Sequence, residues 1–298
     1  MRQRVWLMPE SSQLQGLRKA MSRAPVRVIA VTSGKGGVGK TNVAANTAIA
    51  LSDRGKNVMI LDADLSLANI DVLLGLQPRF NLAHVLNGEA DLASTILSGP
   101  KAVRIVPSAS GNRSMMDLSP RSQAAIVQAF SELVDQPDIL IVDTATGISD
   151  GVARFVEAAN QAIVVVCDEP ASLTDAYALI KVLSVHYGIT HFDVITNQTR
   201  HEREGRRLFE KLNRVADRFL DVVLCHLGNI PHDEWLRRAV QEQRSVVDAY
   251  PASESGRAFT AIANALDASL APRGLSGSMQ FFLERSLGFD AHSPGAIA

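Results

Sequence analysis

Short runs of apolar residues recur along the chain, separated by longer segments of mixed character. Seven runs of this kind lie at 26–31, 58–61, 103–106, 139–142, 163–167, 192–196 and 222–227. Most are nearly continuous stretches of Val, Ile and Leu, which is typical of strands that are covered on both faces. Strands that alternate with helices in this way predict an α/β fold with a doubly wound, mostly parallel sheet of about seven or eight strands.

Helical patterns fill the segments between these runs. Residues 41–52 are rich in Ala and Asn and carry an apolar stripe, and Leu208, Leu212, Val215 and Phe219 share one helical face. A stretch rich in Pro, Gly and Ser ends the domain. We therefore expect four parts: a flexible basic arm over 1–24, one α/β domain over 25–270, a linker over 271–278 and an amphipathic tail over 279–298.

Composition narrows the class of protein. The chain is 46% hydrophobic with a net charge of −1, and no apolar run approaches the roughly 20 residues that span a bilayer. The N-terminal segment is charged, but it lacks the apolar stretch that a signal peptide contains. We expect a cytoplasmic protein whose membrane contact, if any, is peripheral. The two cysteines, Cys167 and Cys225, form no CxxC pair, and we expect both to be buried.

A glycine-rich loop follows the first apolar run. Its residues are Gly34, Lys35, Gly36, Gly37, Val38, Gly39, Lys40 and Thr41. This sequence matches the pattern G-x-x-x-x-G-K-[ST]. It lies between a predicted strand and a predicted helix, which is the structural context of a phosphate-binding P-loop. Glycines allow the backbone N–H groups to approach a triphosphate closely. We expect Lys40 to contact the β- and γ-phosphates of ATP and the Thr41 hydroxyl to bind Mg²⁺.

Lys35 gives this loop a second lysine, directly after its first glycine. A second cation beside Lys40 is costly unless it meets negative charge elsewhere. The natural partner is the nucleotide of a second subunit, toward which Lys35 would act as an arginine finger does when it is supplied in trans.

Carboxylates follow two of the predicted strands. Asp62 and Asp64 end the second strand, and Asp143 ends the run at 139–142. The carboxyl ends of parallel strands line the ligand crevice of an open α/β sheet, so Asp143 is placed to hold Mg²⁺. Asp62 and Asp64 are two positions apart, and we expect their side chains to have different roles in the site. For each of the three, an aspartate that caps the following helix is the alternative.

Three motifs together resemble those of the MinD/ParA family of ATPases with a deviant Walker A loop. They are SGKGGVGKT, LDADLSLANIDVLLGL and ILIVDTATG, and the resemblance covers about residues 25–285. The sequences at 103–119, 167–183 and 217–221 are most similar to the family's flagellar-number regulators, the FlhG/FleN group.

The resemblance implies a role for each matching residue. Lys35 is the signature lysine that reaches the partner's phosphates in an ATP-bound dimer, and Asp64 orients the attacking water. Asp62 supports the Mg²⁺ shell, while Asp143 and Gly147 form the second switch. Asn197 reads the adenine edge, and the turn that contains Pro231 and Asp233 flanks the base.

The resemblance also implies a function. A protein of this group hydrolyses ATP slowly, forms a homodimer with ATP, and regulates flagellar number and placement through the flagellar master transcription activator and the FlhF GTPase. The alternative is a DNA-segregating ATPase of the ParA type that binds nonspecific DNA. We expect no direct DNA binding, because Glu202, Glu204, Glu210 and Asp217 interleave with the arginines between 200 and 218.

Both ends of the chain carry candidate contacts. In the tail, Met279, Phe282, Leu283 and Leu287 form one helical stripe, which predicts either a helix packed on its own domain or a lipid anchor. The resemblance implies the anchor, with the protein at the membrane of the cell pole. In the arm, Gln13, Leu17 and Arg18 match the motif by which this group stimulates the FlhF GTPase. A disordered basic tether is the alternative for the arm.

Overall fold

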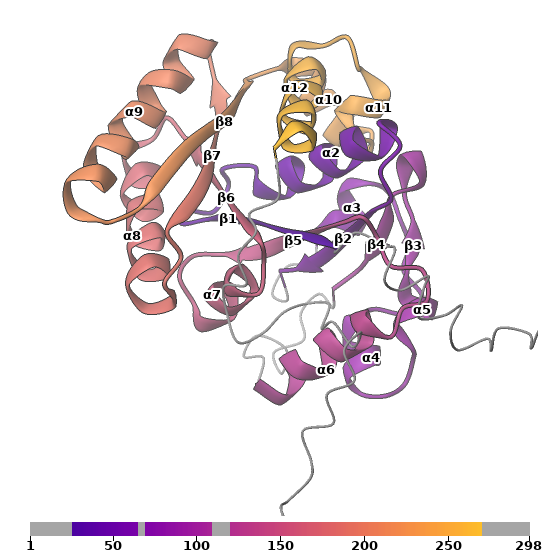
Figure 1. Ribbon diagram of the computed structural model, residues 1–298. Coiled ribbons are helices and arrows are strands. Elements are labelled where there is room, and N and C mark those ends of the chain that lie inside the picture. Colours follow the sequence, from indigo (N-terminus) through magenta and orange to yellow (C-terminus); the bar gives the residue numbers. More distant parts are fainter. Residues whose placement is uncertain (1–25, 65–68, 109–119, 270–298) are drawn as a thin grey trace, which may run out of the picture.

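The computed structural model describes residues 26–64, 69–108 and 120–269. Its centre is one eight-stranded sheet with the order β3-β4-β2-β5-β1-β6-β7-β8 (Figure 1). The strands are β1 (Arg27–Ser33), β2 (Val58–Ala63), β3 (Leu97–Ser98), β4 (Arg104–Val106), β5 (Ile139–Thr146), β6 (Gln161–Cys167), β7 (His191–Thr199) and β8 (Val223–Pro231).

The sheet confirms the predicted fold class. Each of the seven apolar runs forms a strand, and these seven strands pair in parallel. Only β3 was not expected. It is a two-residue strand that pairs antiparallel to β4 at the sheet edge, and two residues are too few to show an apolar pattern.

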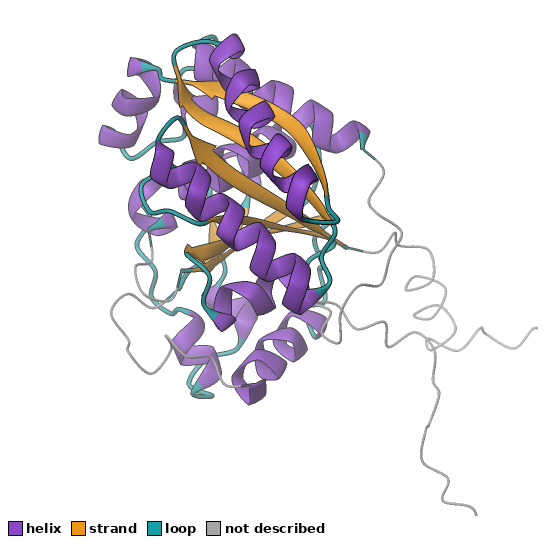
Figure 2. Cartoon of the chain, turned by 90° about the vertical axis from the view of Figure 1, so that its left-hand side faces the viewer, coloured by secondary structure: helices purple, strands orange, loops and turns teal. Residues whose placement is uncertain are grey.

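Helices cover the sheet on both faces (Figure 2). One layer holds α2 (Lys40–Asp53), α3 (Ile70–Leu73), α10 (Glu234–Gln241), α11 (Val246–Ala249) and α12 (Glu254–Ala268). The other holds α4 (Leu82–Leu86), α5 (Leu92–Thr95), α6 (Pro120–Ser131), α7 (Asp150–Glu157), α8 (Pro170–Tyr187) and α9 (Glu202–Phe219), and a short 3₁₀ turn, η1 (Pro100–Ala102), precedes β4.

The alternation of side chains along each strand divides the core in two. In β1, Val28 and Ala30 pack with the layer of α7 to α9, whereas Ile29 and Val31 pack with α2 and α12. Both sets are fully or almost fully buried. This two-sided burial explains why the strands are continuous apolar runs rather than alternating ones.

One expectation about burial was wrong, and the apolar face of α9 is only partly buried. On α9, Leu208 and Leu212 are buried, but Val215 is 42% and Phe219 is 62% exposed, because the buried stripe continues through Ala216. Cys167 is buried as expected, whereas Cys225 is exposed because it lies on the edge strand β8. Among the helices of the described ranges, none has the length and apolar character needed to cross a membrane.

Candidate functional site

The glycine-rich loop joins β1 to α2 at the carboxyl edge of the sheet. The helix begins at Lys40, as predicted, and Gly39 precedes it with a φ of 87°. Gly36 and Gly37 are exposed, with open space where a side chain would stand. The loop therefore presents backbone rather than side chains at the N-terminus of α2, where the helix dipole favours an anion.

Two glycines of the loop are required by close approach. A Cβ atom on Gly34 would overlap the backbone carbonyl of Asp175 in α8, and one on Gly39 would overlap the side-chain amide of Asn197. The left-handed φ of Gly39 is a second reason for glycine there. The loop is thus packed tightly between α8 and the end of β7.

Lys40 and Asp143 form a buried ion pair beneath the loop. The Nζ of Lys40 lies 2.8 Å from Oδ1 of Asp143, and the exposed fractions of the two residues are 6% and 1%. The neighbouring Thr41 hydroxyl acts, like Lys40, to lower the pKa of Asp143. The second carboxylate oxygen, Oδ2, is buried without a hydrogen-bond partner. The structure therefore brings together three residues that were predicted to bind Mg·ATP.

Asp62 lies beside Asp143 on the neighbouring strand. The two residues are direct partners in the β2–β5 register, and both are 1% exposed. Burial and the Asp143 carboxylate raise the pKa of Asp62 to about 8. Burial likewise raises the pKa of Asp143, although Lys40 acts in the opposite direction. Lys40 pairs with Asp143 alone, so the raised pKa of Asp62 reflects a carboxyl that is buried beside this ion pair without a cation of its own.

Asp62 also organises the turn that follows β2. Its carboxylate accepts hydrogen bonds from the backbone N–H groups of Asp64, Asn69 and Ile70, at 3.1 to 3.3 Å. Asn69 and Ile70 stand at the start of α3, so Asp62 has the capping role that was the alternative at this position. Its support of a Mg²⁺ shell stays a prediction, as does the water-orienting role of Asp64.

This chemistry fits a divalent cation next to a phosphate chain. The unpartnered Oδ2 of Asp143 and the Thr41 hydroxyl are hard oxygen donors of the kind that Mg²⁺ prefers. In the described ranges, no cluster of three or more His, Cys, Asp or Glu side chains could hold a metal alone. A Mg²⁺ bound by one or two protein oxygens together with phosphate oxygens agrees with both observations.

Lys35 points away from this ion pair. Its ammonium group pairs with Glu169, the residue that precedes α8, and Ser33 donates from its hydroxyl to the Lys35 carbonyl at 3.0 Å. The bond to Glu169 raises the pKa of Lys35. The single chain thus supplies the negative charge that the second lysine of the loop requires. Sequence reasoning missed Glu169 as that partner.

Asn197 and Gly147 contact the phosphate loop and its strand. The Asn197 side chain donates to the Val38 carbonyl at 2.7 Å, while its own Oδ1 is buried and lacks a partner. An open acceptor at this place suits the predicted adenine contact. Gly147 adopts a φ of 100° and donates its N–H to the Ser33 carbonyl at 2.9 Å, which ties the segment after β5 to the end of β1.

Asp233 holds two helices in place. One carboxylate oxygen accepts from the Trp235 N–H at the start of α10, and the other accepts from the Ser255 N–H and hydroxyl at the start of α12. Its contact with the base stays a prediction. Sequence reasoning did not foresee this bridging role, because it joins the adjacent α10 to α12, which begins only at Glu254 after the intervening α11.

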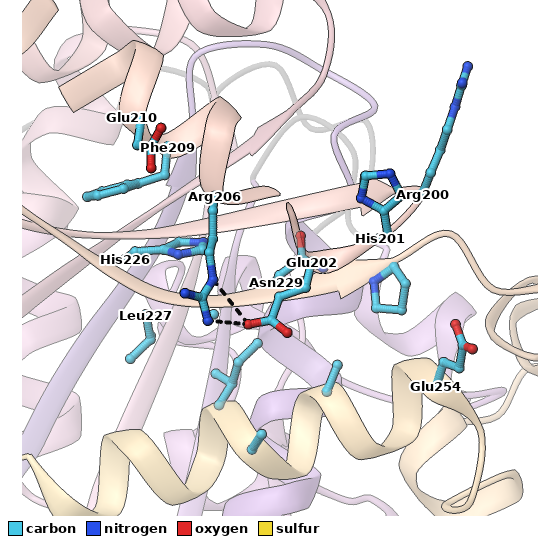
Figure 3. A pocket seen from close by; sticks show the side chains of 15 residues that line it. Arg200, His201, Glu202, Arg206, Phe209, Glu210, His226, Leu227, Asn229 and Glu254 are labelled. Carbon is cyan, nitrogen blue, oxygen red and sulfur yellow. Dashed lines mark hydrogen bonds and ion pairs between the residues drawn. The ribbon is translucent and has the colours of Figure 1, made fainter. Parts of the chain in front are cut away.

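Pro231 lines a pocket on the outer side of β8, between α9 and α12 (Figure 3). On the α9 side, Phe209 stacks on His226 with ring centroids 5.0 Å apart, and Arg206 pairs with Glu202. Burial lowers the pKa of His226. The arginines of α9 are exposed and interleaved with acids, in agreement with the expected solvated face rather than a basic patch.

The remaining candidate residues lie outside the described ranges. These are Gln13, Leu17 and Arg18 of the arm and Met279, Phe282, Leu283 and Leu287 of the tail.

Comparison with known proteins places this chain in a family. A family model described as ParA, NUBPL iron-transfer P-loop NTPase, matches residues 25–267. The chain is 54% identical to the antiactivator FleN of Pseudomonas aeruginosa over 90% of this chain and 96% of FleN. It is 34% identical to the flagellum site-determining protein YlxH of Helicobacter pylori over 75% of this chain and 76% of YlxH.

The chain belongs to the ParA/MinD family of P-loop ATPases. Its fold agrees with the solved septum site-determining protein MinD of Pyrococcus horikoshii in complex with Mg-ADP. The TM-score is 0.69 at 30% identity, and the match covers 82% of this chain and 97% of that MinD chain. The ParA/MinD assignment confirms the predicted resemblance, the fold and the ATPase class.

Proposed function

We propose that this protein is a Mg·ATP-dependent switch that regulates the number and placement of flagella. The observation that carries the proposal is the phosphate loop with its Lys40–Asp143 pair, in a chain that is 54% identical to an antiactivator, FleN, over 96% of FleN's length. The similarity to a flagellum site-determining protein supports the same role.

Lys40, Thr41 and Asp143 are the residues that would hold Mg·ATP. The cation would supply neutralisation of phosphate charge when it is bound. Lys40, which pairs with Asp143 in this structure, would bind phosphate oxygens, and Asp143 and the Thr41 hydroxyl would hold the metal. The solved MinD relative contains Mg-ADP, which supports this assignment. Asn197 would accept a hydrogen bond from the adenine amino group at its unpartnered Oδ1.

We further propose that the ATP-bound form is a homodimer in which Lys35 serves the partner's nucleotide. Lys35 must then leave Glu169. An exposed ion pair of this kind is screened by solvent and contributes little to stability, so contact with a triphosphate can replace it readily. In this form the protein would restrain the flagellar transcription activator, and the arm residues Gln13, Leu17 and Arg18 would contact an FlhF-type GTPase.

A count of flagella tests the function. Cells whose only copy carries Lys40→Met should have more flagella than wild-type cells, because the variant lacks the cation that binds phosphate and cannot enter the ATP-bound state. Flagella are counted by electron microscopy, and immunoblotting shows that the variant is present at the wild-type level. A wild-type count in cells with normal amounts of a variant that does not bind ATP would contradict the proposal.

We also propose that the protein is cytoplasmic and binds the membrane peripherally at the cell pole, through Phe282, Leu283 and Leu287 of the tail. An apolar side chain gains about 1.5–3 kcal/mol from full burial, so lipid is a favourable cover for this stripe. Sedimentation with anionic liposomes should rise with ATP relative to ADP, and Phe282→Glu should abolish it without changing ATP binding. Equal sedimentation with the two nucleotides would show that nucleotide does not control the tail.

A further inference from the structure

Gln198 is an extra residue near the carboxyl end of β7. In the pairing with β8, Asn197 lies opposite Ile230 and Thr199 lies opposite Pro231, so Gln198 has no partner of its own and forms a bulge. Its φ is 57°, in the left-handed region that residues other than glycine adopt infrequently. Bulges and unfavourable backbone of this kind are common beside functional sites, where they redirect a side chain.

The bulge directs two consecutive side chains to the same loop. Asn197 donates from Nδ2 to the Val38 carbonyl at 2.7 Å, and Gln198 donates from Nε2 to the Gly37 carbonyl at 3.2 Å. In a regular strand, successive side chains point to opposite faces of the sheet. The left-handed conformation at Gln198 removes this restriction, and two neighbouring amides contact two neighbouring carbonyls of the phosphate loop.

These two contacts fix the orientation of two peptide groups. In a planar trans peptide, the C=O of one residue and the N–H of the next point in opposite directions. A Gly37 carbonyl held toward β7 therefore turns the Val38 N–H away from β7, and a Val38 carbonyl held there turns the Gly39 N–H away. Backbone N–H groups of this loop are the donors that a phosphate chain requires.

We propose that Gln198 is a positioning residue that orients the Gly37–Val38 peptide for phosphate binding. Asn197 does the same for the next peptide, and in addition it faces the base. Gln198 acts through the loop and not through the base. A donor that is oriented before the ligand arrives costs no reorganisation on binding. The inference rests on the proposed binding of Mg·ATP at this loop.

The test is a pair of glycine substitutions at matched sites. Gln243 has the same residue type, a φ of 53° and a side-chain bond from Nε2 to the Val72 carbonyl at 3.0 Å. Gln198→Gly and Gln243→Gly each relieve a left-handed φ and remove one neutral hydrogen bond. Calorimetry with Mg·ATP and with Mg·purine riboside triphosphate, which lacks the adenine amino group, measures affinity for each variant and the wild type.

Gln198→Gly should bind both triphosphates about two- to tenfold more weakly, the effect of one lost hydrogen bond. The melting temperature of the nucleotide-free variant should stay the same or rise, because glycine adopts a positive φ without strain. Gln198→Met, which keeps the approximate length of the side chain but removes the donor without adding a charge, should show the same loss of affinity. Gln243→Gly should bind as the wild type does.

Every other result of these binding measurements would overturn either the positioning role of Gln198 or the proposed function. Wild-type affinity in Gln198→Gly would refute the positioning role and leave the proposed function intact. A loss for ATP but not for purine riboside triphosphate would make Gln198 a base-reading residue. Equal losses in Gln198→Gly and Gln243→Gly would mean a general effect of glycine on the fold. If the wild type binds neither triphosphate, the proposed function fails, and the positioning role fails with it.

Discussion

Replacing Lys35 with alanine should slow ATP hydrolysis by about a thousandfold or more, the effect of removing a cation supplied in trans to a transferring phosphoryl group. ATP binding should largely persist, because Lys35 pairs with Glu169 and does not face the Lys40–Asp143 pair of its own chain. Steady-state hydrolysis and equilibrium ATP binding measure the two effects separately. Glu169→Gln is the matched control, since it breaks the same ion pair but keeps Lys35.

A mixing experiment decides whether Lys35 acts across a dimer. Lys35→Ala retains Asp64, and Asp64→Ala retains Lys35, so each variant alone should be nearly inactive. A heterodimer of the two contains one site with both residues. Random mixing in equal amounts should restore about a quarter of the wild-type rate, because half of the symmetric dimers become heterodimers with one intact site of two. No recovery in heterodimers that are shown to form would refute the role in trans.

The fold was predictable because burial on both faces marks each strand. In the run 139–142, which forms the first half of β5, every residue is buried, and the helices between the strands have enough turns to show a pattern. The two-residue β3 and the exposure of Cys225 were not predictable in this way. Both are properties of sheet edges, and the position of an edge follows from the strand order, which periodicity along one strand does not reveal.

Part of the site was also predictable, for a local reason. The P-loop is one contiguous segment in which the functional glycines and lysine occur at fixed intervals, so the motif alone identifies them. Asp143 directly follows an apolar run, which is also visible in the sequence. The Lys35–Glu169 pair joins residues on different strand ends, and Gln198 owes its direction to a shift of register between β7 and β8. Such contacts depend on tertiary packing, so no short motif indicates them.

Replacing Lys40 with methionine should destabilise the nucleotide-free protein by about 3 kcal/mol at neutral pH, since a buried ion pair that loses one partner leaves an uncompensated charge. Asp143 is 1% exposed and lies beside the equally buried Asp62. The loss has an upper limit, because Asp143 can take up a proton instead of staying as an unpaired charge. At pH 7, protonating a carboxyl with an ordinary pKa near 3.9 costs about 4 kcal/mol, at 1.36 kcal/mol for each pH unit above that pKa. Urea unfolding without nucleotide measures the loss.

The double variant Lys40→Met/Asp143→Asn should recover most of that stability, because it removes both charges and leaves groups of similar volume. The deficit of Lys40→Met should also shrink as the pH falls toward 5. Its folded state holds a carboxyl whose pKa is raised, so the free energy of unfolding decreases as pH rises above the unfolded pKa and recovers as pH is lowered. Neither variant should gain stability from Mg·ATP. Losses that simply add in the double variant would contradict the view that Asp143 depends on Lys40 for its charge.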